Sequence, residues 1–308
     1  MFHKSVLLKE SIDNLDIKRD GIYVDATLGY AGHASEILKK IPDGFLYGID
    51  QDDYAIKCSE DILSTIGNNY KIIKDNFVNM KKILNDMGVD RVDGILFDLG
   101  VSSVQIDDED RGFSFHKDAK LDMRMDRDND FSAYNVVNEY DYKNLVRILR
   151  VYGEEKYASS IAKNIIKYRD GKKIETTLEL VDIIKNSVPF KARRNAHPAR
   201  RSFQAIRIEV NNELGVLKDV LDDALSLLKM GGRLCIISFH SLEDKIVKDT
   251  FNKYTSIDKS LNKLPYIPEK YRPKYRIISK GIVPSSEEIE ANYRSHSARL
   301  RVIERIGE

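Results

Sequence analysis

Acidic residues and a glycine-containing turn stand in the first hundred residues where they could bind a nucleoside. Asp25, Asp50 and Asp98 each end an apolar run that is typical of a β-strand, and the turn 27–33 follows the first run and opens a helix. Glycines let the backbone approach a ligand, and a helix N-terminus offers unpaired N–H groups. An acid at the next strand end accepts hydrogen bonds from ribose hydroxyls. The pattern predicts a site for an adenine nucleoside.

The turn indicates which nucleoside cofactor fits. A dinucleotide fold requires G-x-G-x-x-G so that a pyrophosphate rests on the helix end. Here only Gly29 and Gly32 are glycines, and Ala31 stands between them. The turn favours S-adenosylmethionine, whose amino-acid end needs polar backbone groups rather than phosphate neutralisation. Taken alone, the turn also fits an ordinary strand-to-helix connection in any α/β protein.

Asp50 and Asp98 each have a functional and a structural interpretation. A carboxylate on a ribose diol makes charge-assisted bonds worth roughly 1.5–3 kcal/mol, and the alternative for Asp50 is a helix N-cap beside Asp52 and Asp53. Asp98 could hold the N–H groups of an exocyclic base amine and take up its proton. Its alternative is to cap the strand or to bind only the cofactor, and no proline–aromatic pair follows it.

His240 follows another apolar run, in the segment 238–244. A histidine there could accept or relay a proton, although Ser241 and Asp244 form a capping-box pattern that needs no function. No G-x-S-x-G elbow supports a Ser–His–acid hydrolase. The six histidines include no His-x-x-x-His pair, so we expect no catalytic metal site.

Two basic stretches indicate contact with nucleic acid. The first is free of acidic residues between Asp182 and Glu209, and the second covers 263–276. Arginines for phosphates beside aromatic faces for stacking suit single-stranded RNA, whereas a solvated surface is the alternative for either stretch alone. Because both stretches are expected to flank the cofactor edge, we favour RNA contact.

Apolar runs and helical periodicity define the elements that must position these residues. Strands are expected at 23–26, 45–49, 70–74 and 92–98 with helices between them, which predicts a parallel sheet covered on both faces. Residues 131–188 show only helical patterns. One long amphipathic helix is then expected from Phe203 to Leu228, ending at Gly231-Gly232. The last expected strands are 234–239, 275–283 and 298–305.

A helical block that interrupts a strand–helix alternation indicates an inserted domain. We therefore expect an α/β core formed by residues 1–108 and 200–308, and an inserted all-helical domain at 109–199.

Composition narrows the class of protein. The chain has 308 residues with 50 basic and 49 acidic side chains, so nucleic-acid binding must come from local patches rather than net charge. No apolar stretch approaches the roughly 18 residues that span a bilayer, and no signal-peptide pattern is present. Cys58 and Cys235 have no metal-type spacing and indicate a reducing cytoplasm.

Five motifs in fixed order resemble a known family. They are Ser5–Glu10, Asp98–Ser103, Arg111–Phe115, Leu121–Asp126 and Ser238–Asp244. Over essentially its full length the chain resembles the bacterial small-subunit ribosomal RNA methyltransferases that modify N4 of a cytidine in the decoding region. The resemblance implies a Rossmann-like class I methyltransferase core, S-adenosylmethionine as methyl donor, and a helical insertion that serves as the RNA-substrate domain.

The resemblance also implies the cofactor-binding residues, whereas the catalytic candidates are our mechanistic hypothesis and the RNA-binding candidates come from the two basic stretches. The cofactor-binding set is Ala31, Gly32, His33, Asp50, Phe77, Asp98 and Gln105. The catalytic candidates are Asp98, Ser102 and His240. The RNA-binding candidates are Arg193, Arg194, Arg200, Arg201, Lys270 and Arg272. The chain departs from the family at Ala31, where a second glycine is usual, and at Val104, where a proline is usual.

Two other classes remain as alternatives. A small-molecule methyltransferase would leave the basic stretches unused, and a non-catalytic nucleic-acid-binding protein would leave Asp50 and the glycine turn unused. The sequence leaves open whether the RNA is naked or part of an assembled subunit. It also leaves open the oligomeric state, a homodimer included.

Overall fold

The computed structural model describes residues 5–193, 197–257 and 268–308, which divide into two compact units. The first unit consists of the chain up to Gly100 together with Leu214–Glu308, and the second is Val101–Glu213. The second unit is longer at both ends than the 109–199 expected from the sequence. The reason is that Val101, Ile106 and Phe203 pack into its hydrophobic core.

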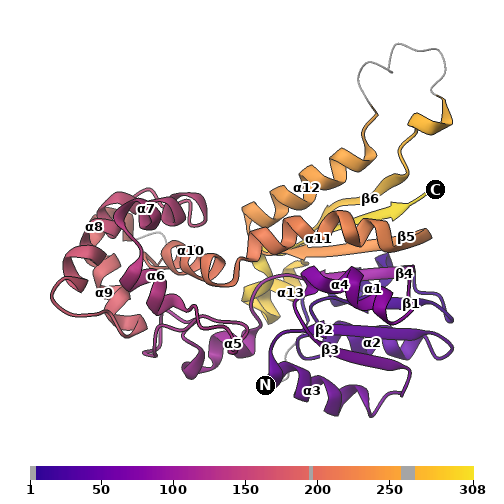
Figure 1. Ribbon diagram of the computed structural model, residues 1–308, viewed down its shortest axis with the longest axis horizontal. Helices are drawn as coiled ribbons and strands as arrows, with labels where there is room; N and C mark the ends of the chain where they lie inside the picture. Colours follow the sequence, from indigo (N-terminus) through magenta and orange to yellow (C-terminus); the bar gives the residue numbers. More distant parts are fainter. Residues whose placement is uncertain (1–4, 194–196, 258–267) are drawn as a thin grey trace. The chain divides into compact units, whose positions relative to one another are not determined.

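The first unit is built on a seven-stranded sheet in the order β3-β2-β1-β4-β5-β7-β6 (Figure 1). Its strands are β1 (Ile22–Asp25), β2 (Phe45–Asp50), β3 (Tyr70–Lys74), β4 (Val92–Asp98), β5 (Leu228–Ser238), β6 (Tyr275–Ile282) and β7 (Arg299–Arg305). The five strands from β3 to β5 are parallel, as expected, and β7 is antiparallel to both β5 and β6.

Helices cover both faces of this sheet. They are α1 (Leu8–Asn14), α2 (Gly32–Lys40), α3 (Asp53–Leu63), α4 (Met80–Asp86), α11 (Glu213–Leu227), α12 (Ser241–Thr255) and α13 (Ser286–Ala291), with short 3-10 turns η1 (Phe77–Asn79), η5 (Glu269–Tyr271) and η6 (Tyr293–Ser297). Alternate strand residues enter different cores: Tyr23 packs with Ile37 of α2, whereas Val24 packs with Leu221 of α11. This alternation buries the strands on both faces, as near-continuous apolar runs predict.

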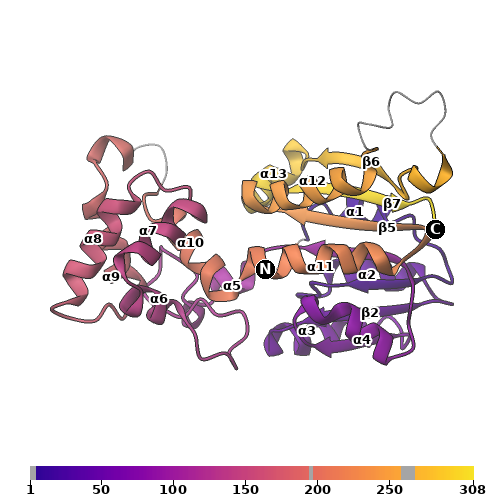
Figure 2. The ribbon, with the colours of Figure 1, turned by 45° about the horizontal axis from the view of Figure 1, so that its top comes forward.

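The second unit is helical around one hydrophobic core (Figure 2). Its elements are α5 (Ser103–Asp107), η2 (Glu109–Arg111), α6 (Ala133–Glu139), α7 (Tyr142–Val151), α8 (Ala158–Arg169), α9 (Thr177–Ser187), η3 (Phe190–Arg193) and α10 (Arg200–Asn211). A capping box formed by Thr176 and Glu179 starts α9.

Two expected boundaries are wrong. The helix expected from Phe203 to Leu228 is two helices, because Asn212 adopts the left-handed conformation with φ 49° and ends α10. The following strand begins at Leu228 rather than Leu234, so it runs through the glycine pair at which the helix was expected to end. Among the residues described, no helix has both the length and the apolarity needed to cross a lipid bilayer.

Candidate active site

The three acids of the sequence pattern meet at one edge of the sheet in the first unit. Asp25 is in register with Gly48 of β2 and Leu96 of β4, and Asp98 is in register with Ile237 of β5. Since these strands are parallel, Asp25, Asp50 and Asp98 all stand at their carboxyl ends, where α/β sheets bind ligands. We call this the acidic edge.

The turn between β1 and α2 brings the backbone close to this edge. Gly29 has φ 51°, and its N–H donates to Oδ2 of Asp50 at 2.8 Å. Ala31 is also left-handed, with φ 56°, and is fully buried in the core. A side chain other than glycine costs on the order of 1 kcal/mol in that conformation. A Cβ atom at Gly32 would lie 1.8 Å from Oγ of Ser5, so the N-terminal segment packs directly on the turn.

Asp50 is held by two backbone groups. Its Oδ2 accepts from Gly29 and its Oδ1 accepts from the N–H of Asp52 at 2.9 Å. Burial raises the pKa of Asp50, and these N–H groups oppose the rise. Asp52, not Asp50, is the N-cap of α3, because its carboxylate accepts from Tyr54. Each carboxylate oxygen has two lone pairs, so Asp50 keeps acceptor capacity for ribose hydroxyls.

Asp98 has the least satisfied carboxyl group of the acidic edge. Its N–H donates to Oγ1 of Thr27 at 2.6 Å, but its Oδ1 is buried and accepts no hydrogen bond from the described residues. Burial, followed by the charges of Asp25, Glu243 and Glu288, holds the pKa of Asp98 well above its usual range. Burial also raises the pKa of Asp25 from 3.8 to about 7. A cation bound here would relieve both penalties.

His240 follows β5 at the same edge and is the N-cap of α12. Its Nδ1 accepts from the N–H of Glu243 at 3.4 Å, and the Glu243 carboxylate accepts from the N–H groups of Phe239 and His240. The capping box therefore uses His240 and Glu243, and the expected box of Ser241 and Asp244 is wrong. The Nε2 atom of His240 is buried 3.1 Å from Oε1 of Glu243 without hydrogen-bond alignment.

The remaining predicted cofactor and catalytic residues lie on other elements. Phe77 is half-buried in η1, edge-on to Phe97 with ring centroids 5.3 Å apart. Ser102 and Gln105 belong to the second unit, where they form a capping box: each side chain accepts from the other's N–H at 3.1 Å. This box fixes Gln105 without the proline that the family usually has at Val104.

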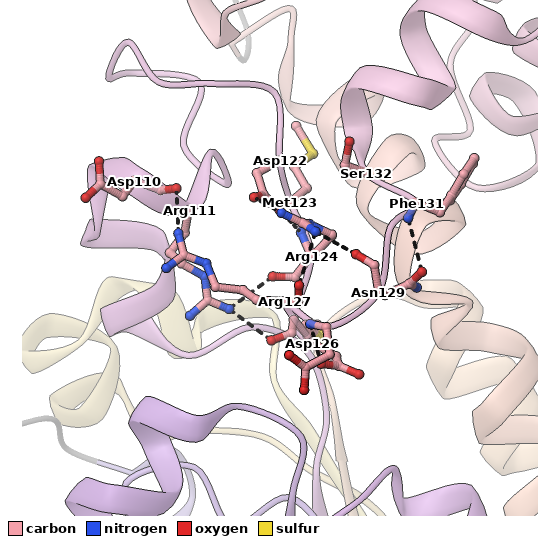
Figure 3. A network of polar contacts seen from close by, with 12 residues as sticks. Asp110, Arg111, Asp122, Met123, Arg124, Asp126, Arg127, Asn129, Phe131 and Ser132 are labelled. Atoms are coloured by element: carbon pink, nitrogen blue, oxygen red, sulfur yellow. Dashed lines mark hydrogen bonds and ion pairs between the residues drawn. The ribbon is translucent and has the colours of Figure 1, made fainter.

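The motifs Arg111–Phe115 and Leu121–Asp126 both lie in one loop region of the second unit, part of which is drawn in Figure 3. The buried Arg111 donates through Nη2 to the carbonyls of Arg124 and Met125, both at 3.0 Å. Arg124 in turn makes a bidentate pair with Asp122 at 2.8 Å. Burial alone would raise the pKa of Asp122, but the bonds from Arg124 lower it. Arg111, Asp122 and Arg124 therefore have a structural role in this loop.

The first basic stretch lies in the second unit and is partly committed to the fold. Arg193 donates to the carbonyl of Val188 and Arg201 to that of Glu154, both at 2.9 Å. Arg200 is exposed, and Arg194 lies outside the described residues.

The second basic stretch is not where it was expected. Tyr275 pairs with Arg305, and Glu304 pairs with Arg233 near the start of the parallel part of β5. Residues 263–267 lie outside the described residues, but the described part, 268–276, leads into the end of the sheet opposite the acidic edge, so the expectation that this part flanks the cofactor is wrong. Arg272 is exposed; the backbone of Lys270 lies in η5, but its side chain is outside the description.

Sequence reasoning missed three residues that act on Asp98. Thr27 accepts from its backbone N–H, and a hydroxyl two residues after a strand is a signal that could have been used. Glu243 stands three residues after His240, which is capping-box spacing. Glu288 accepts from the N–H of Leu7 across the chain, and no local pattern indicates that contact.

Comparison with known proteins identifies the family. A family model described as the MraW methylase family matches residues 1–306. The chain belongs to the MraW methylase family. A curated relative, the ribosomal RNA small subunit methyltransferase H of Exiguobacterium sibiricum, is 50% identical over 308 residues, which cover 99% of each chain.

Solved structures are similar at lower identity. A putative rRNA-methylase from Clostridium thermocellum has a TM-score of 0.45 at 14% identity, covering 99% of this chain and 100% of its own. A putative methyltransferase from Streptococcus mutans in complex with SAH has a TM-score of 0.43 at 13% identity, with the same coverage. The predicted fold class of this MraW methylase is confirmed: a mainly parallel, Rossmann-like sheet with helices on both faces and an all-helical insertion.

Proposed function

We propose that this protein transfers a methyl group from S-adenosylmethionine to the exocyclic N4 of a cytidine in the decoding region of small-subunit ribosomal RNA. Membership of the MraW methylase family establishes a methyltransferase, and the curated relative acts on ribosomal RNA of the small subunit. The decoding-region position and the residue roles below are our proposal.

The residues of the acidic edge fit the methyl donor. Ala31, Gly32 and His33 would hold its amino-acid end, Asp50 its ribose and Phe77 its adenine. The family resemblance adds Gln105, on the second unit, as a further cofactor residue of this proposal. Two observations support this fit: Asp50 keeps acceptor capacity, and Asp98 offers a buried oxygen without a partner. When bound, the donor supplies an electrophilic methyl group on a sulfonium, and a positive charge suits an edge whose carboxyl groups repel one another.

The unpartnered Oδ1 of Asp98 is the observation that carries the proposed chemistry. The lone pair of a cytosine amine is delocalised into the ring, so an acceptor that holds its N–H groups makes the nitrogen more nucleophilic. A carboxylate whose pKa is raised is also a stronger base, which favours uptake of the amine proton. Ser102 and His240 cap helices, and we propose that they orient the base while Asp98 takes the proton.

The cytidine would leave its stack, or arrive unpaired, to reach this edge. We propose that the helical unit is the RNA-substrate domain and that Arg193, Arg194, Arg200 and Arg201 on it, with Lys270 and Arg272 on the first unit, contact RNA phosphates. We further propose that the protein acts in the cytoplasm, where ribosomal RNA is processed.

A direct test is methylation of small-subunit ribosomal RNA from cells that lack this protein, followed by mass mapping of nucleosides. We expect N4-methylcytidine at one decoding-region position. Methylation of a different base, or none, would overturn the proposal. A small-molecule methyltransferase would be indicated instead by activity that does not respond to salt, because each phosphate contact of a single strand contributes a log–log slope of roughly −0.7.

A further inference from the structure

A cavity of about 400 Å³ lies at the end of the first unit opposite the acidic edge. It is bounded by the end of α11, the end of α12 and the residues before β6. Five cationic side chains line it: Arg91, Lys253, Arg272, Lys274 and Arg305. Figure 1 shows β5 beginning at this end of the unit, beside the C-terminus. We call this cavity the far-edge pocket.

Three of these five side chains have no carboxylate partner among the described residues. Within residues 5–193, 197–257 and 268–308, Arg91, Lys274 and Arg305 form no ion pair, and Lys253 pairs with Asp222 at 3.1 Å. The whole chain has a net charge of only +1. The far-edge pocket therefore gathers positive charge in a chain that is nearly neutral overall, and a polyanion is the ligand that this charge favours.

Part of this charge has a structural role. Arg91 donates to the carbonyl of Ser226, and Arg305 donates to that of Leu228 at 2.8 Å. Both arginines thus satisfy carbonyl groups at the end of α11, where the helix dipole favours cations. A guanidinium has five N–H donors, so these bonds leave donors for a ligand. The side chain of Lys274, by contrast, bonds no carbonyl group among the described residues, and it is exposed where it lines the far-edge pocket.

Tyrosines supply the apolar surface of the far-edge pocket. Tyr254 meets Tyr275 edge-on with ring centroids 5.5 Å apart, and the Tyr275 hydroxyl donates to the carbonyl of Leu225. Burial raises the pKa of Tyr275, and the nearby charges of Arg305 and Arg91 oppose the rise. Tyr271 is different, because 47% of its surface is exposed at the opening. Cations for phosphates beside an exposed ring for stacking are the features that bind single-stranded nucleic acid.

We propose that the far-edge pocket binds a single-stranded segment of the RNA substrate, with phosphates on Arg272 and Lys274 and a base on Tyr271. This inference rests on the proposed function, in which RNA is the polyanionic substrate. The parallel part of β5, from Arg233 to Ser238, separates the pocket from the acidic edge by about 17 Å at roughly 3.3 Å per residue. The contact is thus remote from the reacting amine and contributes substrate binding rather than chemistry.

The test measures RNA binding without the methyl donor. A fluorescent single-stranded RNA of decoding-region sequence is titrated by anisotropy at several salt concentrations with the full-length protein. For the double variant Arg272→Gln/Lys274→Gln we expect affinity to fall fivefold or more. We expect the slope of log affinity against log salt to shrink by about 0.7 to 1.4, which corresponds to one or two lost phosphate contacts. The matched control is Lys57→Gln/Lys82→Gln, which removes two exposed positive charges from α3 and α4.

A second pair of variants tests stacking. Tyr271→Ala should weaken RNA binding on the order of fivefold or more, whereas Tyr271→Phe should bind as the wild type does, because the ring carries the stacking energy. Thermal melting of each variant establishes that it is folded.

The proposal is overturned if the Arg272/Lys274 variant keeps the wild-type affinity and salt slope, or if the Lys57/Lys82 control loses as much. Failure of the proposed function is a separate result: a wild-type protein that leaves ribosomal RNA unmethylated. A wild-type protein that methylates RNA while the far-edge variants bind it normally would refute the far-edge pocket alone.

Discussion

Oδ2 of Asp98 lies 3.7 Å from Nδ1 of His33, and the other ring nitrogen of His33, Nε2, lies 3.1 Å from the carbonyl oxygen of Val6. A carbonyl can only accept, so Nε2 carries a hydrogen, and Nδ1 is the ring nitrogen that faces Asp98. Burial raises the pKa of Asp98, so this carboxyl group takes up a proton more readily than an exposed aspartate does. The 3.7 Å between Nδ1 and Oδ2 exceeds hydrogen-bond length, so the two side chains would have to move slightly closer to form a hydrogen bond.

Asp98→Asn should separate binding from catalysis. The amide has nearly the same shape and still accepts an N–H bond, but it cannot take up a proton. We expect single-turnover methyl transfer at saturating donor to slow by about 100-fold or more, which is typical of a lost general base. Donor affinity, measured by equilibrium dialysis, should change much less. Full turnover by this variant would restrict Asp98 to a binding role.

Asp25 should make stability depend on pH. Its pKa is 3.8 ordinarily and about 7 in the folded protein, so the folded state binds the proton more tightly. The resulting stabilisation is complete below pH 3.8 and is lost as the pH rises to about 7. Complete loss amounts to up to about 4 kcal/mol at 1.36 kcal/mol per pKa unit. Urea unfolding between pH 4 and 8 should show this decline in the wild type and a weaker one in Asp25→Asn; parallel curves would contradict it.

Asp50→Asn should weaken donor binding by tenfold or more. Both carboxylate oxygens accept backbone N–H bonds, and an amide can offer only one acceptor oxygen. Loss of a charge-assisted bond of roughly 1.5–3 kcal/mol predicts that factor. Calorimetric titration with S-adenosylmethionine provides the measurement. Asp53→Asn is the control, because that carboxylate is exposed and pairs with Lys74. Equal effects of the two substitutions would remove Asp50 from the proposed site.

Gly112→Ala should destabilise the helical unit. Gly112 has φ 67°, and a Cβ atom there would lie 2.3 Å from the backbone oxygen of Lys120. Left-handed strain together with a backbone clash predicts a loss of about 2 kcal/mol or more in the free energy of unfolding. Gly171→Ala, which meets only a carbonyl oxygen at 3.8 Å, should cost less than half as much. Denaturant titrations of both variants decide this.

Local patterns predicted the regular elements well. The strands 70–74 and 92–98 have the expected bounds, because each is an apolar run between clear stop signals, and the segment 131–188 is helical as expected. The break at Asn212 escaped prediction because the apolar spacing continues on both sides of it. Only the backbone conformation reveals it, and asparagine tolerates that conformation better than most residues.

The acidic edge was predictable in outline only. Parallel strand order places three acids at one edge, and sequence is sufficient for that step. Partners of each acid depend on contacts from distant segments: Thr27 and Glu288 reach Asp98 through tertiary packing. Residues 268–276 lead into the end of the sheet opposite the acidic edge because β6 and β5 both run antiparallel to β7, and apolar runs do not reveal strand direction.

The strand β7 lies inside the sheet, between β5 and β6. During synthesis the chain as far as Arg305 must therefore leave the ribosome before the sheet can close. Residues 101–213 form one uninterrupted segment, so they emerge complete while β4 still awaits its neighbour β5. A nascent chain that stalls before Arg299 would expose β5 as an unpaired edge, and such edges are where chains aggregate. A truncation before Arg299 would thus remove an interior strand.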